Sequence, residues 1–382
     1  MLKIAVGHSD DPDSLEAAHD VLEQCQTSLG GEKPQAGILF AAIDFDHQLI
    51  LNCINEAFPD IELIGGTTDG EVSSVLGFQQ DSLTLMLFCS DEIEICAAVG
   101  RNVSQDPAAI AQQTIEASKS KLKTPPRLCI AIPESLTTSA SLILQGLKTA
   151  LGEVPIFGGA TADQTKMQCT YQFYKTEVLS NSVPLLLFGG NLLFSHGVAS
   201  GWSPIGKRST VTKVEHNIIY EIDGEPALNF YHYYLNDFMP DAAYPLAVFP
   251  PGEDIFFLRG AIGYDQELGS ITVSGDVPEH STVQITQAAQ EDIISASKTA
   301  FDHALETYPG TEPAAALFFS CAWRRWILGT QTDQEYATIA KALAQPLPNC
   351  GFYTYGEIAP LRDHGPTFMH NTTFVTLLLG SH

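Results

Sequence analysis

Basic residues are scarce in this chain. It holds 19 lysines and arginines against 45 aspartates and glutamates, which gives a formal net charge of −26. A surface of that sign repels the phosphates of nucleic acids and of anionic membranes. The composition therefore excludes nucleic acid and membrane surfaces as direct partners.

Long apolar runs are absent as well. The most apolar stretch, 183–194, is interrupted by two glycines and Asn191, and it is too short to span a bilayer. The amino terminus turns polar after six residues and lacks the apolar region of a secretion signal. We therefore expect a cytoplasmic protein.

Cysteine pairs with a recognisable spacing are also missing. None of the eight cysteines forms a C-x-x-C pair, no cluster has the spacing of a zinc site, and no C-x-x-C-H motif exists for covalent c-type haem. Most of the cysteines lie in apolar runs, where a free thiol behaves as a small buried hydrophobe. This pattern indicates a reducing compartment.

Three glycine-rich loops stand out among the residues that are present. They read Ile64-Gly65-Gly66-Thr67-Thr68-Asp69-Gly70-Glu71, Phe157-Gly158-Gly159-Ala160-Thr161-Ala162-Asp163 and Cys350-Gly351-Phe352-Tyr353-Thr354-Tyr355-Gly356-Glu357. Glycine permits positive φ and close backbone approach, and consecutive free N–H groups make an anion-receiving concavity. The same residue types are common in plain tight turns. The repetition favours a shared structural role and a shared pocket.

The loops belong to a repeating order of strand, helix, strand, helix and loop. Residues 97–100 echo residues 4–7, and Asp106-Pro107 echoes Asp11-Pro12. We expect the second copy to end with a strand over 192–198 and the third copy to begin with a strand over 282–285. The residues between, about 201–279, show short alternating strands typical of an antiparallel meander. The predicted fold class is α/β, with repeated units, mixed sheets and an inserted antiparallel meander.

Four motifs resemble the FIST family. They are residues 65–71 for its N-terminal domain and residues 223–227, 320–325 and 351–358 for its C-terminal domain. The resemblance implies a FIST N-terminal domain over 1–215, with two α/β units, and a FIST C-terminal domain over 216–382, with the meander and the third unit. FIST proteins are regarded as sensory modules for small ligands, with amino acids proposed. We expect no enzyme activity.

The resemblance also implies a partner. A subset of FIST proteins are haemoproteins that sense nitric oxide and control a histidine kinase or a cyclic-di-GMP enzyme. This chain ends at His382 with no kinase, cyclase or DNA-binding unit attached. We therefore expect its output to pass through a separate signalling protein.

The candidate ligand-binding residues come from the loops and from scarce arginines. Arg259 lies in an apolar strand, either as a clamp for a ligand carboxylate or in a structural ion pair with Glu357 or Asp69. Arg324 and Arg325 follow an apolar strand, and one of them could reach a pocket. Carboxylates in the loops could accept a ligand ammonium or cap a turn. The full set is Gly66, Thr67, Thr68, Asp69, Glu71, Gly159, Thr161, Arg259, Arg324, Tyr353, Tyr355 and Glu357.

Two histidines are candidate iron ligands if haem b is bound. His196 and His232 both lie among apolar or aromatic residues, as a proximal haem ligand would, although a core histidine often has such neighbours too. Cys321 lacks the local signature of a cysteine hydrolase and is expected to be a buried thiol. The sequence thus predicts a small-ligand sensor, with a haem-based nitric oxide sensor and an enzyme using acidic pocket residues as alternatives.

Overall fold

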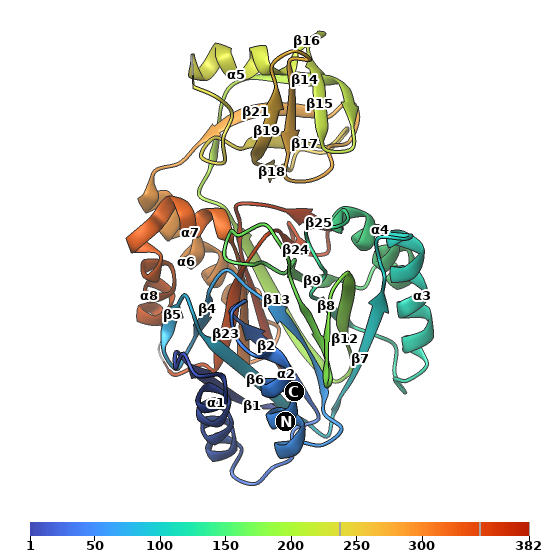
Figure 1. Ribbon diagram of the computed structural model, residues 1–382, viewed down its shortest axis with the longest axis vertical. Coiled ribbons are helices and arrows are strands. Elements are labelled where there is room, and N and C mark those ends of the chain that lie inside the picture. The colour runs from blue at the N-terminus through green and yellow to red at the C-terminus, as the bar shows by residue number, and fades with distance from the viewer. Residues whose placement is uncertain (237, 344, 382) are drawn as a thin grey trace.

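A computed structural model describes residues 1–236, 238–343 and 345–381 of the chain. Within these residues, strands form three six-stranded sheets and one eight-stranded sheet. Figure 1 shows a main lobe, which contains both termini, and a smaller lobe above it. The predicted α/β class, with mixed sheets and an inserted antiparallel meander, is confirmed. No helix in the described ranges has the length and hydropathy needed to cross a membrane.

The first unit follows the predicted order of elements. It contains β1 (Lys3–Ser9), α1 (Ser14–Leu29), β2 (Ala36–Ala41), α2 (His47–Ala57), β3 (Glu62–Thr67), β4 (Glu71–Ser73), β5 (Gly77–Gln79) and β6 (Leu83–Cys89). Helix α1 begins where the Asp13 side chain accepts hydrogen bonds from the N–H groups of Leu15 and Glu16. It ends at Gly30, whose φ of 61° is the left-handed conformation that glycine adopts without strain.

The second unit repeats this order. It contains β7 (Ile93–Arg101), α3 (Pro107–Lys119), β8 (Leu128–Ala131), α4 (Ala140–Leu151), β9 (Ile156–Gly159), β10 (Gln172–Tyr174), β11 (Glu177–Leu179) and β12 (Ser182–Gly190). Asp106 caps α3 as Asp13 caps α1, and Pro107 occupies the first turn of α3.

The third unit is interrupted by the meander. Its elements are β13 (Leu192–Ala199), α6 (Gln290–Glu306), β22 (Ala315–Cys321), α7 (Ala322–Leu328), η1 (Gly329–Gln331), α8 (Asp333–Ala342), β23 (Asn349–Thr354), β24 (Glu357–Pro360), β25 (Thr367–His370) and β26 (Phe374–Ser381). The meander contains β14 (Ser203–Glu215), β15 (Ile218–Ile222), β16 (Glu225–Pro226), α5 (Ala227–Leu235), β17 (Leu246–Phe249), β18 (Phe257–Arg259), β19 (Ala261–Asp265), β20 (Ser270–Val273) and β21 (Thr282–Gln287).

Two predictions about the third copy are wrong. Strand β13 pairs along its whole length with β26, so it opens the third unit and does not end the second. Strand β21 pairs with β14 and β17, so it belongs to the meander. The meander is therefore inserted between the first strand and the first helix of the third unit, which places it beside the remaining elements of that unit.

Each unit contributes a hairpin to the sheet of another unit. The β4–β5 hairpin pairs with β23, the β10–β11 hairpin with β3, and the β24–β25 hairpin with β9. The exchange closes a cycle of three units. In this register Glu71, Gln172 and Glu357 occupy equivalent positions, opposite Phe352, Gly66 and Gly159 respectively.

The largest buried cluster lies between the three six-stranded sheets. Phe40 on β2, Phe157 on β9 and Phe352 on β23 all contribute to it, and the rings of Phe40 and Phe352 stack with centroids 4.4 Å apart. Removing one such side chain from water contributes about 3 kcal/mol at most. Figure 1 shows α3 and α4 on one flank of the main lobe and α6 and α8 on the other, so the helices cover the outer faces of the sheets.

Candidate functional site

The three glycine-rich loops meet and are fastened to each other by backbone hydrogen bonds. The N–H of Asp69 donates to Tyr353 O at 2.9 Å, that of Ala162 to Thr67 O at 2.8 Å, and that of Tyr355 to Ala160 O at 3.2 Å. We call residues 66–71, 159–163 and 352–357 together the loop ring. The repeated loops thus share a structural role, as the sequence predicts.

The backbone N–H groups of the loop ring do not form the expected anion-receiving concavity. The N–H groups of Thr67, Ala160 and Tyr353 donate to carbonyls of neighbouring segments, in addition to the three bonds above. The glycines allow close packing instead. A Cβ on Gly66 would lie 2.4 Å from Thr161 Cγ2, and one on Gly159 would lie 2.7 Å from Thr354 Oγ1.

Each unit buries one hydrogen-bonded acid or amide at the equivalent position of its hairpin. Ser82 Oγ donates to Glu71 Oε2 at 2.5 Å, and Thr373 Oγ1 donates to Glu357 Oε2 at 2.6 Å. The equivalent residue in the second unit is Gln172. Burial raises the pKa of both Glu71 and Glu357 to about 8. Neither of these two glutamate side chains has any exposed surface.

Gln172 is missing from the sequence-based candidates. The second loop is longer, and counting from its paired glycines places Asp163-Gln164 at the positions of Gly70-Glu71. Counting from the hairpin strand instead identifies Gln172, because β10 pairs with β3 as β4 pairs with β23.

Asp69, like Glu357, has one buried carboxylate oxygen without a partner among the described residues. Its Oδ2 accepts a hydrogen bond from Arg325 Nη1 at 2.7 Å, while its Oδ1 is buried and has no partner among the residues that the structure describes. Burial raises the pKa of Asp69 to about 6, Arg325 opposes this shift, and the nearby carboxylate of Asp163 adds to it. An N–H donor from a ligand would complete this site.

Arg325 connects Asp69 to the surface. Its side chain is 13% exposed, and it lines a pocket of about 520 Å³ together with Phe78, Trp326 and Thr332. In the described part of the chain its guanidinium makes one hydrogen bond, to Asp69. The planar group therefore retains donors that could bind a ligand carboxylate.

Tyr355 and Asp163 lie next to this pair and stabilise the long second loop. Tyr355 OH donates to Asp163 Oδ1 at 2.5 Å and accepts from the N–H of Thr165 at 2.7 Å. The other oxygen of Asp163 accepts from the N–H groups of Gln168 and Cys169. The predicted ligand residue Tyr355 therefore has a structural partner at the edge of the candidate site.

Arg324 and Tyr353 lie in a buried cluster behind the ring. Arg324 Nε donates to Glu335 Oε1 at 2.9 Å, and Tyr353 OH donates to Glu335 Oε2 at 2.8 Å. Both Arg324 and Glu335 are fully buried. Of the two adjacent arginines, the structure thus places Arg325, and not Arg324, at the opening beside Asp69.

Arg259 lies apart from Asp69. Its guanidinium donates to Asp276 O, Met369 O and Asn371 Oδ1, at 3.0 to 3.2 Å. The expected ion pair with Glu357 or Asp69 does not form within the described residues, because neutral acceptors surround the group. Burial lowers the pKa of Arg259 to about 10. It lines a separate pocket of about 690 Å³ between the meander and the main lobe.

Comparison with known proteins identifies the chain. The model of the FIST N domain matches residues 35–225, and that of the FIST C domain matches residues 227–360. The chain belongs to the FIST family. FIST domains are associated with signal transduction and small-ligand sensing. The loop ring of this FIST protein is built from both matched regions.

Two relatives of this FIST protein match it over nearly their whole length. An uncharacterized protein of Mycobacterium tuberculosis is 24% identical over 386 residues, which cover 95% of this chain and 96% of that protein. An uncharacterized protein of Mycobacterium bovis is 23% identical over 393 residues, which cover 97% of both chains. The match to a crystal structure of cyanuric acid hydrolase from A. caulinodans spans the full length of both chains, with 9% sequence identity and a TM-score of 0.40.

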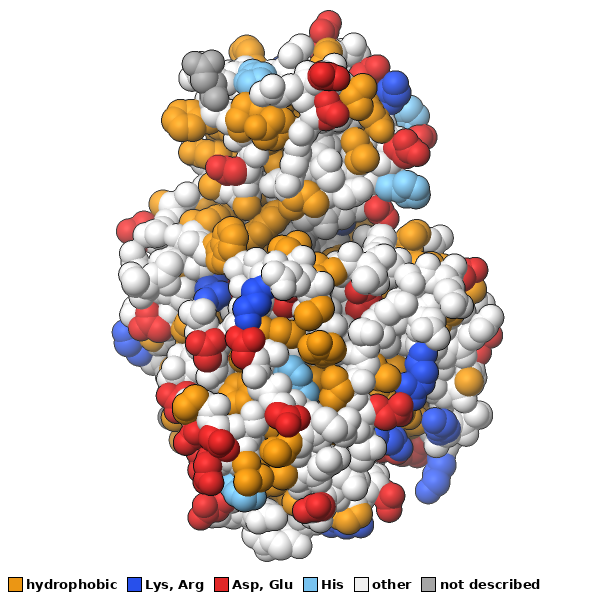
Figure 2. Space-filling view, in the orientation of Figure 1, with side chains coloured by type: hydrophobic (Ala, Val, Ile, Leu, Met, Phe, Trp, Pro, Cys, Tyr) orange, Lys and Arg blue, Asp and Glu red, His pale blue; other side chains and the backbone are white. Residues whose placement is uncertain are grey.

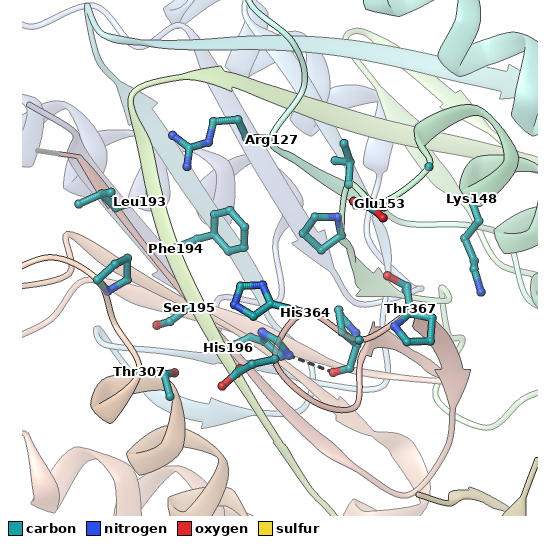
Figure 3. A pocket seen from close by; sticks show the side chains of 18 residues that line it. Arg127, Lys148, Glu153, Leu193, Phe194, Ser195, His196, Thr307, His364 and Thr367 are labelled. Carbon is teal, nitrogen blue, oxygen red and sulfur yellow. Dashed lines mark hydrogen bonds between the residues drawn. The ribbon is translucent and has the colours of Figure 1, made fainter. Parts of the chain in front are cut away.

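The two histidines proposed for haem are far apart in this FIST chain. His196 on β13 lines a pocket of about 900 Å³, and its Nε2 is 3.1 Å from Pro360 O. Figure 3 shows His196 and His364 in this pocket, with Arg127 and Lys148 toward opposite sides of it. His232 lies on α5 in the meander, with its Nδ1 2.9 Å from Asn236 O. The described residues contain no group of three or more His, Cys, Asp or Glu suited to a metal ion.

Proposed function

We propose that this protein senses a small amino acid or a related amine-carboxylate, bound at the loop ring beside Asp69 and Arg325. The observation that carries the proposal is the Asp69–Arg325 pair. It combines a buried carboxylate oxygen that has no partner within the described ranges and an arginine that lines an open pocket. A zwitterion matches both groups.

The recognition chemistry follows from the donors and acceptors of the pair. The guanidinium of Arg325 binds the ligand carboxylate in a bidentate manner, and Asp69 Oδ1 accepts from the ligand ammonium. Phe78 and Trp326 supply apolar surface for the ligand side chain. Because Asp69 has no exposed surface, the Arg325 side chain must move for the ligand to reach it. The ligand therefore selects a conformation in which the Asp69–Arg325 pair is opened.

The signal passes to a separate protein. As in signalling members of the FIST family, we take this partner to be a histidine kinase or a cyclic-di-GMP enzyme in the cytoplasm. The meander offers apolar surface for such a contact, because Tyr233 and Phe238 are 77% and 76% exposed and Ile262 and Leu268 are more than half exposed. Figure 2 shows hydrophobic side chains on the flank of the upper lobe and at the waist below it.

A thermal-shift screen tests the proposal. Wild-type protein is melted with each L-amino acid and with small mono- and dicarboxylates at millimolar concentration. A ligand that binds the folded state raises the melting temperature. We expect at least one compound to do so, and we expect Arg325→Gln to abolish that rise while still unfolding cooperatively.

Arg101→Gln is the matched control for this screen. Arg101 forms an exposed ion pair with Glu177 at 2.8 Å on the main lobe, outside the loop ring. This variant should respond to the ligand as wild type does. A ligand-induced shift that survives in Arg325→Gln would place the binding site elsewhere.

We infer a second candidate function, haem-based sensing of nitric oxide, from the pocket around His196. The β4–β5 and β10–β11 hairpins of the main lobe have short turns, 74–76 and 175–176, whereas the turn of the equivalent β24–β25 hairpin spans 361–366. The pocket beside the short turn 175–176 has a volume of about 170 Å³, whereas the pocket beside the long turn 361–366 has a volume of about 900 Å³. Four residues of the longer turn, 363–366, line the larger pocket.

The residues of this pocket suit haem in part. Phe194 and four prolines supply apolar surface, and Arg127 and Lys148 carry charges suited to propionates. His196 would coordinate through Nδ1, since Nε2 bonds to the Pro360 carbonyl. Bound haem would supply the iron that takes up nitric oxide. An absorption spectrum with added haemin tests this function: a Soret band that is lost in His196→Ala supports it, and a colourless protein excludes it.

Enzyme activity at the loop ring is distinguished from ligand sensing by whether the bound compound is converted. A carboxylate whose pKa is near 6 beside an arginine would also suit acid–base chemistry. NMR spectra of each stabilising compound, recorded before and after a long incubation with the protein, decide between the two. A sensor leaves the compound unchanged, whereas an enzyme converts it.

A further inference from the structure

The meander is attached to the main lobe by two chain crossings that lie against each other. The first crossing, 199–203, leaves β13, and the second, 287–290, leads into α6. Gly201 has a φ of 89°, and a Cβ there would lie 2.6 Å from Asp292 O near the start of α6. The two crossings therefore form one hinge.

Arg324 on α7 binds this hinge. Its Nη1 donates to Ser200 O in the first crossing, and its Nη2 donates to Ile293 O, in the first turn of α6, at 2.8 Å. Its Nε is bonded to the buried Glu335. A fully buried guanidinium that bonds to the first crossing and to the first turn of α6, which the second crossing enters, keeps the hinge in one geometry.

The residues on either side of Arg324 contact the two parts of the molecule that the hinge connects. Arg325 pairs with Asp69 in the loop ring. Trp323 packs against Gly260 in the meander, so closely that a Cβ on Gly260 would lie 1.8 Å from Trp323 Cζ3. Three successive residues of one short helix thus contact the meander, the hinge and the candidate ligand site.

A second connection runs in parallel through Asn371. Its Nδ2 donates to Tyr355 O in the loop ring at 3.3 Å, and its Oδ1 accepts from Ser274 Oγ in the meander at 2.8 Å and from Arg259 Nη1 at 3.1 Å. Arg259 therefore has a structural reason to lie at this junction. Both connections begin at loop-ring residues and end in the meander.

We infer that α7 transmits the state of the Asp69–Arg325 pair to the meander, so that the meander is the lobe that reports ligand binding. The inference rests on the proposed function for its biological meaning. Its physical content is that opening the pair loosens the contacts of Arg324 with the hinge and of Trp323 with Gly260. Such coupling is reciprocal, so a change at Trp323 also alters the loop ring.

Amide hydrogen exchange tests the inference without any ligand, because Asp69→Asn weakens the pair directly. Exchange under native conditions reports local opening of each segment. We expect Asp69→Asn to speed exchange about fivefold or more over 199–203 and over 257–265, which contains the Gly260 contact. The exposed-pair variant Arg101→Gln should leave both segments unchanged.

A double-mutant cycle with Trp323 identifies the route. In a Trp323→Ala background, the effect of Asp69→Asn on residues 257–265 should fall below about twofold. If the alanine variant folds poorly, Trp323→Phe keeps an aromatic ring against Gly260 and should retain the response.

Two results would overturn the inference. One is an effect of Asp69→Asn confined to the loop ring and residues 322–333. The other is a meander response of equal size with and without the Trp323 ring. Because no ligand is added, a failed amino-acid screen would leave this experiment informative, and a failure here would leave ligand binding intact.

Discussion

Replacing Glu71 by glutamine should make the stability of the protein less dependent on pH. Burial raises the pKa of Glu71 from 4.5 to about 8 in the folded state. Between these values the folded protein holds a proton that the unfolded chain has released. Protonated Glu71 therefore makes its full contribution to the free energy of unfolding below pH 4.5, and this contribution is lost as the pH rises toward 8. This shift in the pKa of Glu71 corresponds to about 5 kcal/mol in the free energy of unfolding.

The second unit shows how an amide fits this position. Gln172 accepts from Ser182 Oγ at 3.1 Å and donates to Thr161 Oγ1 at 3.0 Å. In Glu71→Gln the introduced amide can accept from Ser82 and donate to Thr68, the equivalent residues. The substitution therefore removes the titration while keeping neutral hydrogen bonds in place of those of the protonated acid.

Urea unfolding at pH 5 and at pH 8.5 measures the effect. We expect wild type and Glu71→Gln to differ by less than about 1 kcal/mol at pH 5, and the variant to be more stable by up to about 5 kcal/mol at pH 8.5. A difference between Glu71→Gln and wild type that is the same at both pH values would refute the reasoning.

Three further predictions concern packing, buried charge and thiol chemistry. Arg324→Ala leaves its carboxylate partner buried and unpaired, so urea titration should show a loss of about 3–5 kcal/mol, and a loss below about 1 kcal/mol would contradict this. Gly65→Ala would place a Cβ 1.9 Å from a neighbouring carbonyl oxygen, whereas one at Gly31 meets no atom within 4 Å. Thermal melts should therefore show a cost of about 3 kcal/mol or more for the first and about 1 kcal/mol for the second. A thiol reagent should label the exposed Cys169 faster than the buried Cys321, whose pKa is raised by burial, as mass spectrometry of digests would reveal.

The loops could be predicted from the sequence because their packing demands particular residues. Gly65 and Gly158 each pack against a carbonyl of the neighbouring strand, and a Cβ at either position would lie 1.9 Å from that oxygen. Such a constraint leaves a visible Gly-Gly pair in two of the three units. The third unit keeps the first glycine, Gly351, and has Phe352 where the others have a second glycine.

The hairpin exchange and the start of the third unit could not be predicted. Pairing of Glu71 with Phe352 joins residues far apart in the chain, and no local pattern marks it. Strands β12 and β13 are both apolar and are separated by a single residue, Asn191, so the boundary between units leaves no compositional trace. Which of Arg324 and Arg325 faces the opening depends on the rotation of α7, which tertiary contacts set.

Calorimetric titration at pH 6 in two buffers tests the proposed ligand site most directly. The best compound from the thermal screen is titrated in MES and in Bis-Tris, whose heats of protonation differ. Asp69, with a pKa of about 6, is about half protonated at that pH, and an ammonium bound to it favours the ionised form. We expect release of about half a proton per ligand at pH 6, release close to zero at pH 8, and no binding to Arg325→Gln. Binding without proton release at pH 6, or unchanged binding to Arg325→Gln, would contradict this expectation.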